Sequence, residues 1–458
     1  MTQTATKISN YEADYQAIRE QRAASNPAWL TQLGDQAWTR FTELGFPTAR
    51  RGNERWKYTN VAPIANASFG LSSDLVAGSD HESELRRAAP WDDEWINLVF
   101  LDGRFSKVLS NLNASDSGNG RILVNNLAEA INSGAANLEQ LLAKHVKFQE
   151  DGFAALNTAF LGDGAFVQVP DGSVLQSPVN LIYLTSTSNQ PTVCYPRTLV
   201  AVGKGAQATV IESYVGIKSG ALNPEYFTNA VTEISLAEGA ILDHYRVVSE
   251  AKQAFHVGTS RISQGHDSVF SSASFAIGAT LARNDFEVLL DGPGASCNLN
   301  GLYLTADAQH MDNLISIDHA QPHTSSQLNY KGILDGKSRA VFGGQVLVRK
   351  DAQKVSAHQS DKNLLLSSQA EVDSKPSLLI YADDVQCGHG ATAGHVDKDS
   401  LFYLRSRGLD ADTASRMLVH AFAREVIETV KVEPLKQFLD ELFLEAIPET
   451  GLKLGGAA

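Results

Sequence analysis

The chain has 458 residues, and its 52 acidic residues against 38 Lys and Arg give a net charge of −14. Hydrophobic residues make up 43% of it, enough for a large buried core, which argues against a disordered chain. The negative charge argues against nucleic-acid binding, which requires clustered Lys and Arg. No apolar stretch approaches the roughly 18 residues of a membrane span, and the N-terminus lacks the pattern of a targeting segment. The sequence therefore predicts a soluble, cytoplasmic protein.

Residues 1–95 form the first section, which we predict to be helical. Residues 11–23 and 27–44 are predicted helices, since apolar residues recur in the second at near-helical spacing. The segment that follows mixes charges with Trp56 and Tyr58. A packed connector that buries both rings is the favoured interpretation. A peptide- or nucleotide-binding edge is the alternative.

Residues 96–395 form a β-rich section. Its short apolar runs are separated by Gly, Asp and Asn turn signals rather than by helical patterns of ten or more residues. A doubly wound sheet is excluded because it needs crossover helices, which leaves two sandwiches, a propeller or a stacked β-solenoid. The solenoid is favoured because similar small-residue corners recur. These corners are VGKGAQATV, LAEGAILDH, LDGPGASCN and LDGKSRAVF.

Residues 396–458 form the third section and return to a helical pattern. Asp410 and Asp412 favour the start of one helix, and Pro434 fits the first turn of another, which stops before Pro448. The final GLKLGGAA should fray. Two short amphipathic helices cannot form a core alone, so they must dock on the β section, on the N-terminal helices or on a partner. One interpretation is a structural cap over the open end of the solenoid.

Cys387 and His389 are the candidate metal ligands. If the strand that contains Leu379 continues, alternation places both side chains on one face, and thiolate with imidazole suits iron or zinc. Two ligands make only half of a tetrahedral site, so the pair is either inert or completed by another chain or a bound cluster. Cys194 and Cys297 are most simply buried residues.

A second cluster of polar residues precedes this pair, and its members could bind metal or satisfy turns; the second reading is favoured. The cluster consists of His310, Asp312, Asp318, His319 and His323. Asp383 and Asp384 resemble the paired carboxylates of β-helical polysaccharide enzymes, but neighbours on a strand face opposite sides. The sequence contains no P-loop, no dinucleotide-binding glycine motif and no GxSxG elbow.

Several long motifs resemble the SufB/SufD family of iron–sulfur cluster assembly scaffolds, and the likeness covers nearly the whole chain. The motifs are GFPTARRGNERWKYTNV, HMDNLISIDHAQPHTSSQLNYKGIL, SRAVFGGQVLVRKDAQKVSAHQSDKNLLLS and YADDVQCGHGATAGHVDKDSLFYLRSRGL. The phrase Cys-x-His-Gly-Ala-Thr followed by Phe-Tyr-Leu, together with the scarcity of cysteine, points to the SufD branch of the family.

The resemblance implies a mainly β fold, with a right-handed parallel β-helix flanked by N- and C-terminal helices. It also implies a non-catalytic scaffold subunit that pairs with a SufB paralogue, or with itself when isolated, and binds a SufC ATPase through the C-terminal helices. A transient cluster would form at the interface of the two scaffolds, with His389 ranked above Cys387 as ligand and no cluster held stably by this chain alone. Arg405, Arg407 and Phe422 are the candidate ATPase contacts.

Two other hypotheses remain from the sequence. A β-helical carbohydrate-active enzyme would need an exposed groove with two carboxylates at catalytic separation. A purely structural binding module would recruit partners through its helices and tolerate replacement of both Cys387 and His389.

Overall fold

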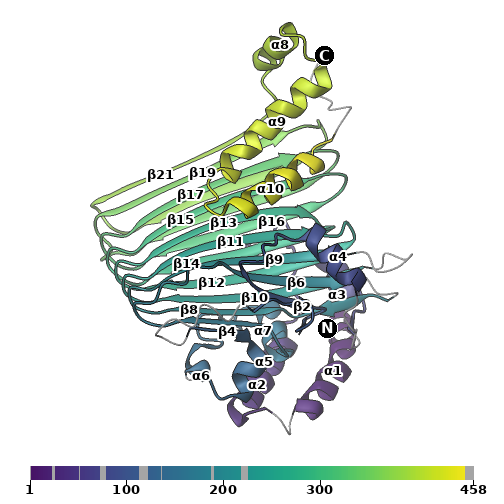
Figure 1. The fold of residues 1–458 in the computed structure, drawn as a ribbon, viewed down its shortest axis with the longest axis vertical. Helices are drawn as coiled ribbons and strands as arrows, with labels where there is room; N and C mark the ends of the chain where they lie inside the picture. The colour runs from purple at the N-terminus through teal and green to yellow at the C-terminus, as the bar shows by residue number, and fades with distance from the viewer. Residues whose placement is uncertain are drawn as a thin grey trace.

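The computed structural model of the chain describes residues 2–22, 26–50, 52–72, 79–112, 122–135, 137–186, 190–217 and 225–448. Its centre is a parallel β-solenoid made of an 11-stranded and a 10-stranded sheet (Figure 1). The solenoid prediction is therefore confirmed. From β8 (Arg197–Val202) to β21 (Val385–Gly394) successive strands alternate between the two sheets, so each of these coils contributes one strand to each, and the propeller and double-sandwich alternatives are wrong.

From β8 onward the first sheet carries the even-numbered strands and the second sheet the odd-numbered ones. The path of the first sheet comprises β4 (Leu123–Asn126), β5 (Ala165–Val169), β8 (Arg197–Val202), β10 (Tyr226–Leu236), β12 (Ala254–Gln264), β14 (Leu281–Leu290), β16 (His310–His319), β18 (Arg339–Val348) and β20 (Glu371–Ile380), with β1 (Gly70–Leu71) and β7 (Thr192–Cys194) beside it. The second sheet comprises β3 (Arg104–Phe105), β2 (Ile96–Leu101), β6 (Val179–Ser186), β9 (Gln207–Ile217), β11 (Ile241–Glu250), β13 (Val269–Gly278), β15 (Ser296–Thr305), β17 (Ser325–Leu334), β19 (Val355–Leu365) and β21 (Val385–Gly394).

Glycine corners turn the chain from one sheet to the other. Gly205, Gly239, Gly294 and Gly336 adopt φ between 61° and 74°, a region that costs other residues steric strain. In the first three corners the next residue is an alanine with 0% exposure. The recurring phrases therefore mark corners, as predicted, because each supplies a left-handed residue and a small one that fits inside.

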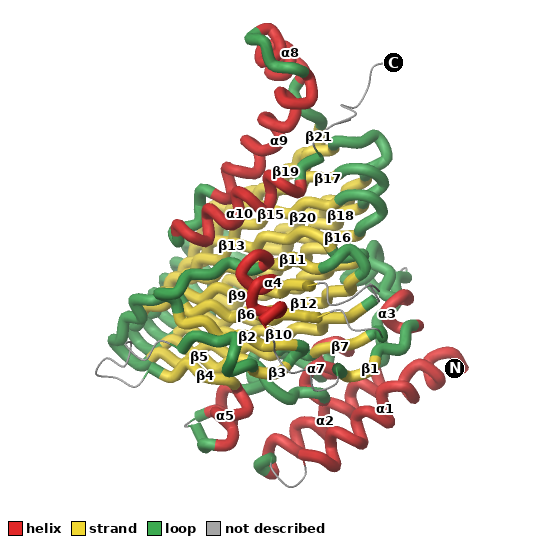
Figure 2. The backbone as a smooth tube through the Cα atoms, turned by 45° about the vertical axis from the view of Figure 1, so that its right-hand side comes forward, coloured by secondary structure: helices red, strands yellow, loops and turns green. Residues whose placement is uncertain are grey.

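The N-terminal helices cover the outer face of the first sheet. α1 (Thr2–Arg22) and α2 (Ala28–Leu44) match the two predicted helices, although α1 begins nine residues earlier than expected. They pack with α7 (Gly152–Ala159) over Phe227 and Phe255 of β10 and β12. Figure 2 shows α1, α2 and α7 grouped at one end of the solenoid. The other helices of this half are α3 (Ala62–Asn66), α4 (Ser79–Ala88), α5 (Leu127–Asn132) and α6 (Leu138–Leu141). The β-rich section thus contains helices, α5 to α7, all shorter than ten residues.

The C-terminal helices lie on the outer face of the second sheet. They are α8 (Lys398–Ser406), α9 (Ala411–Ile427) and α10 (Glu433–Ala446). α9 and α10 pack on outward side chains such as Phe275, Leu302 and Ile333, whereas α8 projects beyond the solenoid (Figure 1). The interpretation that they cap the open end is wrong, because the apolar surface that they bury lies on the sheet face.

The final GLKLGGAA lies outside the described residues. Within the described part of the chain, no helix is both long and apolar enough to cross a membrane.

Candidate functional site

Cys387 and His389 lie on β21, the last strand of the solenoid. The prediction that one strand runs on from Leu379 is wrong: β20 ends at Ile380, the chain turns, and β21 begins at Val385. The two side chains nevertheless share a face, because they are two residues apart on one strand. β21 pairs with β19 alone among the described strands, so this face forms the open end of the solenoid interior (Figure 1).

The register fixes what each side chain meets. Cys387 lies opposite Ala357 and packs, half-buried, against the solenoid core. Burial raises the pKa of its thiol, so burial favours the protonated form. His389 is exposed and lies opposite Gln359, whose Nε2 is 3.3 Å from its Nδ1. A Cβ on Gly390 would meet nothing within 4 Å, so the backbone here is open to close approach.

A polar column lies inside the solenoid on β19, where Gln359 is opposite His389 and Asp361 is opposite Ala391, and the sequence analysis missed it. Asp361 is 1% exposed and accepts hydrogen bonds from Ser374 Oγ (2.6 Å) and Asn363 Nδ2 (2.8 Å). Tyr303 donates to Asn363 Oδ1 at 2.5 Å. Burial raises the pKa of Asp361 to about 6, although these hydrogen bonds act in the opposite direction. Asp361 Oδ1 and Gln359 Oε1 are buried without a hydrogen-bond partner.

The ligand inventory at this end is small. Among the described residues, no group of three or more His, Cys, Asp or Glu side chains is arranged to hold a metal ion. Cys387 and His389 supply one sulfur and one nitrogen, both suited to iron. The donor types therefore suit iron, and the described residues do not supply the remaining ligand positions.

The second sequence cluster is structural. Arg283 and Thr59 bind Asp312, and Thr59 Oγ1 lies 3.0 Å from His310 Nε2. Asp318 pairs with Arg349 at 2.7 Å. The reading that these residues satisfy local polar groups is the one that their contacts support.

The other members of that cluster and the acidic pair also have local roles. His323 occupies a corner with φ of 61°. Asp383 and Asp384 lie in the turn between β20 and β21, not on a strand, and Asp384 pairs with Lys354. The described contacts therefore give no pair of catalytic carboxylates here.

His319 gives an acid-sensitive contribution to stability. It is fully buried, with Nδ1 2.7 Å from Thr324 Oγ1 and Nε2 2.9 Å from Ser326 Oγ, and burial lowers its pKa from 6.5 to about 4. Below pH 6.5 the His319 imidazole binds a proton in the unfolded chain, whereas in the folded chain it stays neutral until the pH approaches 4. Stability should therefore fall by about 3 kcal/mol in total as pH drops from 6.5 to 4. Denaturant unfolding should show a shallower pH slope in His319→Asn; an unchanged slope would contradict this assignment.

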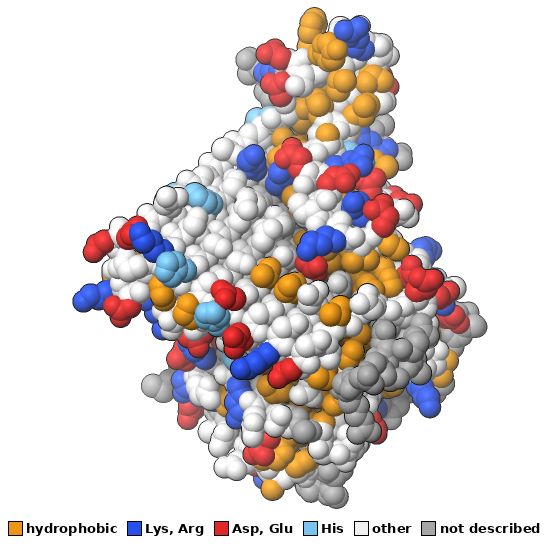
Figure 3. Space-filling model, turned by 60° about the vertical axis from the view of Figure 1, so that its left-hand side comes forward, with side chains coloured by type: hydrophobic (Ala, Val, Ile, Leu, Met, Phe, Trp, Pro, Cys, Tyr) orange, Lys and Arg blue, Asp and Glu red, His pale blue; other side chains and the backbone are white. Residues whose placement is uncertain are grey.

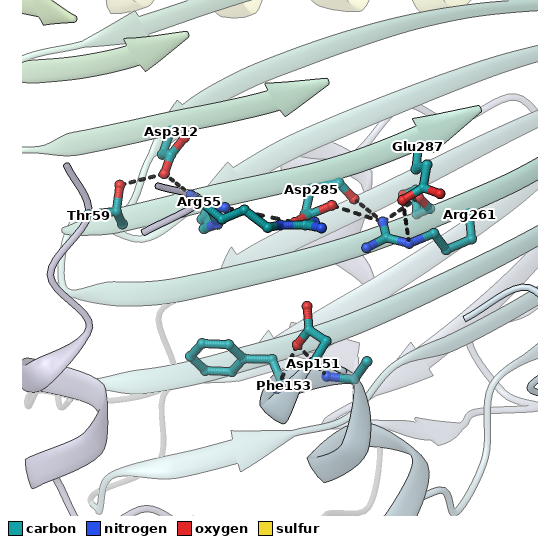
Figure 4. Close-up of polar contacts among 11 residues, drawn as sticks. Arg55, Thr59, Asp151, Phe153, Arg261, Asp285, Glu287 and Asp312 are labelled. Atoms are coloured by element: carbon teal, nitrogen blue, oxygen red, sulfur yellow. Dashed lines mark hydrogen bonds and ion pairs between the residues drawn. The ribbon is translucent and has the colours of Figure 1, made fainter. Parts of the chain in front are cut away.

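The connector, residues 52–61, is pinned to the outer face of the first sheet. Trp56 is buried, with Arg283 stacked 3.8 Å from its ring centroid, and Arg55 pairs with Asp285 at 2.5 Å (Figure 4). Burial alone would raise the pKa of Asp285, but the guanidinium groups around it outweigh burial and hold the pKa well below its ordinary range. Tyr58 is half-buried. The packed-connector interpretation is the one that these contacts support.

The projecting α8 carries exposed aromatic side chains. Phe402 and Tyr403 are 74% and 55% exposed, and Met417 on α9 is 50% exposed. Figure 3 shows hydrophobic side chains gathered on this projection. A short helix cannot bury four consecutive apolar residues on one face, so the LFYL run of α8 was a signal for this surface that the sequence analysis did not use.

The predicted ATPase contacts differ in their exposure. Arg405 and Arg407 are exposed on the same projection, and Arg407 stacks 5.0 Å from the centroid of the Tyr403 ring. Phe422 instead belongs to α9 and is half-buried against the solenoid, with the Lys331 ammonium 4.3 Å from its ring centroid. Its contacts therefore hold α9 on the solenoid.

The edges of the last coil expose apolar surface next to the candidate ligands. Leu379, Ile380 and Tyr381 are 40%, 39% and 64% exposed. Pro376 lies within β20, a position open to proline because β20 is an edge strand of its sheet. The end that carries Cys387 and His389 thus presents unpaired strand edges and apolar side chains together.

Comparisons with known proteins agree with this architecture. Residues 183–422 match the model of the SufBD core domain of the SUF system for iron–sulfur cluster assembly, and residues 5–181 match the SufBD N-terminal region. A SufBD family assembly protein from Synechocystis is 32% identical, with 94% of this chain and 95% of the relative aligned. SufD of Escherichia coli is 29% identical (93% and 95%), and SufD of Bacillus subtilis is 25% identical (95% and 97%). The chain therefore belongs to the SufB/SufD family, on its SufD branch.

Proposed function

We propose that this member of the SufB/SufD family is a non-catalytic, cytoplasmic scaffold subunit that supplies His389, with Cys387 beside it, to an iron–sulfur cluster shared with a SufB paralogue. The cluster is the cargo of the complex and not a resident cofactor of this chain. The observation that carries the proposal is a pair of ligands that no described residue completes, at an end of the solenoid where no described strand follows β21. Because iron takes four ligands in such clusters, the pair is useful only at a boundary between molecules.

Strand edges provide the contact with the paralogue in this proposal. β20 and β21 end the two sheets, and an exposed edge offers unpaired N–H and C=O groups to another chain. The apolar side chains of Leu379, Ile380 and Tyr381 add contact area beside that edge. The same surface could join two copies of this chain when the paralogue is absent.

The projection formed by α8 and the start of α9 is the proposed docking surface for a SufC ATPase. Phe402 and Tyr403 would anchor the contact, and Arg405 and Arg407 lie beside them. α9 connects this surface to the second sheet through Val419 and Ala423, which are buried against it. Movement of the bound ATPase would thereby reach the coils that carry His389.

Replacement of His389 by alanine tests the cluster role. We expect cluster formation by the assembled complex to fall at least tenfold, because a ligand is lost. The measurement is iron and sulfide bound per complex under anaerobic conditions, with Cys387→Ser expected to have a smaller effect. His358→Ala is the matched control, because His358 is exposed on the outer face of β19. Undiminished assembly by His389→Ala would overturn the proposal.

A further inference from the structure

Gln359 contacts the candidate ligand from inside the solenoid. It is 4% exposed on β19, and strand pairing places it directly opposite His389. Its carboxamide lies 3.3 Å from Nδ1 of the imidazole. The other imidazole nitrogen, Nε2, is therefore the one left for a ligand at the open end.

The direction of this hydrogen bond decides whether Nε2 can bind a metal. If the amide N–H of Gln359 donates, then Nδ1 of His389 holds the lone pair that accepts. The single proton of the neutral imidazole then lies on Nε2 of His389. A protonated nitrogen cannot be a ligand. In that orientation Gln359 Oε1 is also buried without a partner, which costs free energy.

The opposite orientation of the carboxamide removes both difficulties. A half-turn exchanges two groups of nearly equal shape and brings Oε1 onto Nδ1–H. The amino group then needs an acceptor, and Asp361 Oδ1 is buried without one, two residues along the same inward face of β19. The two could meet directly or through one water molecule. Ser374 and Asn363 hold the other carboxylate oxygen of Asp361 in place.

We propose that Gln359, backed by Asp361, is a positioning residue that keeps His389 in the Nδ1–H form and presents the Nε2 lone pair at the open end. Metal-binding histidines commonly donate their other N–H to such an acceptor, which fixes the ring and its tautomer. In passing between the two forms, Nε2 releases its proton to solvent and Nδ1 takes one from solvent, so the ring stays neutral. This inference rests on the proposed ligand role of His389.

Nitrogen-15 NMR of the isolated chain tests the tautomer without any cluster. With labelled histidine at about pH 8.5, where an ordinary imidazole is neutral, the signals of His389 are those missing from the His389→Ala spectrum. We expect the unmodified chain to show mostly Nδ1–H. Gln359→Met, which keeps the size of the side chain and removes the acceptor, should shift the ring toward Nε2–H, and Gln359→Glu should restore Nδ1–H.

Assembly of the cluster by the full complex gives the second readout. We expect Gln359→Met to lower it about tenfold or more, and Gln359→Glu to retain most of it. The inference would be overturned if His389 in the unmodified chain were mostly protonated on Nε2. It would also be overturned if the tautomer populations of His389 were the same in the unmodified chain and in Gln359→Met. Either result would count even if His389→Ala blocks assembly. A different outcome is that NMR gives the expected tautomers but His389→Ala assembles clusters normally. That outcome would overturn the proposed function, while the effect of Gln359 on the His389 tautomer would stand.

Discussion

Replacing Glu233 by alanine is expected to lower the free energy of unfolding by about 3–5 kcal/mol, because it leaves the Arg197 guanidinium buried without its counter-charge. Both side chains are 0% exposed, and Arg197 Nη2 lies 2.5 Å from Glu233 Oε1. Glu233 also accepts three backbone N–H groups, which the substitution would strand. They belong to Ala143, His145 and Val146.

The effect should be seen as a lower midpoint of guanidinium unfolding, followed by several probes. Glu238→Ala is the matched control: Glu238 also forms an ion pair, with Lys204 at 3.3 Å, but both side chains are more than half exposed. Exposed pairs of this kind contribute about 0–1 kcal/mol. Equal effects of the two substitutions would mean that Arg197 finds another partner or water. The structural consequence is specific, because Glu233 on β10 ties the segment at residues 143–146 to the solenoid.

The corners of the solenoid were predictable because their chemistry is local. A glycine with positive φ followed by a small residue can be recognised in a short phrase, as at Gly239 and Ala240. The helix starts at Asp397 and Asp410 are local in the same way, since each side chain caps a backbone N–H three residues on.

The docking face of the C-terminal helices could not be predicted from their own pattern. An amphipathic helix shows that it packs somewhere, but its partner surface consists of single residues from several coils. Phe275, Leu302 and Ile333 come from β13, β15 and β17, and each faces outward on its strand. Only the strand pairing brings them together, so the sequence could indicate docking on the β section but not that the helices pack on a sheet face instead of capping the open end.

The candidate site was predictable only in part for the same reason. Cys387 and His389 are two residues apart, so alternation alone gives them one face. Gln359 lies 389 − 359 = 30 residues before its partner. Elsewhere in the same sheet the offset is 296 − 269 = 27 residues between β13 and β15, and 241 − 207 = 34 between β9 and β11. Without a fixed repeat, no sequence argument could place Gln359 opposite His389 or Asp361 opposite Ala391.

If a SufC ATPase docks on the projection as proposed, the double substitution Phe402→Asp with Tyr403→Asp should weaken that binding about 100-fold or more. Exposed aromatic anchors that become buried in an interface commonly cost 2 kcal/mol or more each when removed, and a carboxylate in their place adds a desolvation cost. The two side chains are 74% and 55% exposed, so the unfolding midpoint of the chain should hardly change. Titration calorimetry of the chain with the purified ATPase measures the affinity.

Val108→Asp is the control for this substitution, since Val108 is 81% exposed and lies outside the projection. It introduces one carboxylate, half of the charge that the double variant adds, on an exposed apolar residue and should leave the affinity unchanged. If the double variant binds as tightly as the unmodified chain, the projection is not the docking surface. If the double variant and Val108→Asp both bind equally weakly, the cause is the negative charge added to a chain of net charge −14. The loss of the aromatic side chains is then not the cause. If affinity is lost only in the double variant, the projection is the docking surface, and α9 is then the element that connects the bound ATPase to the second sheet.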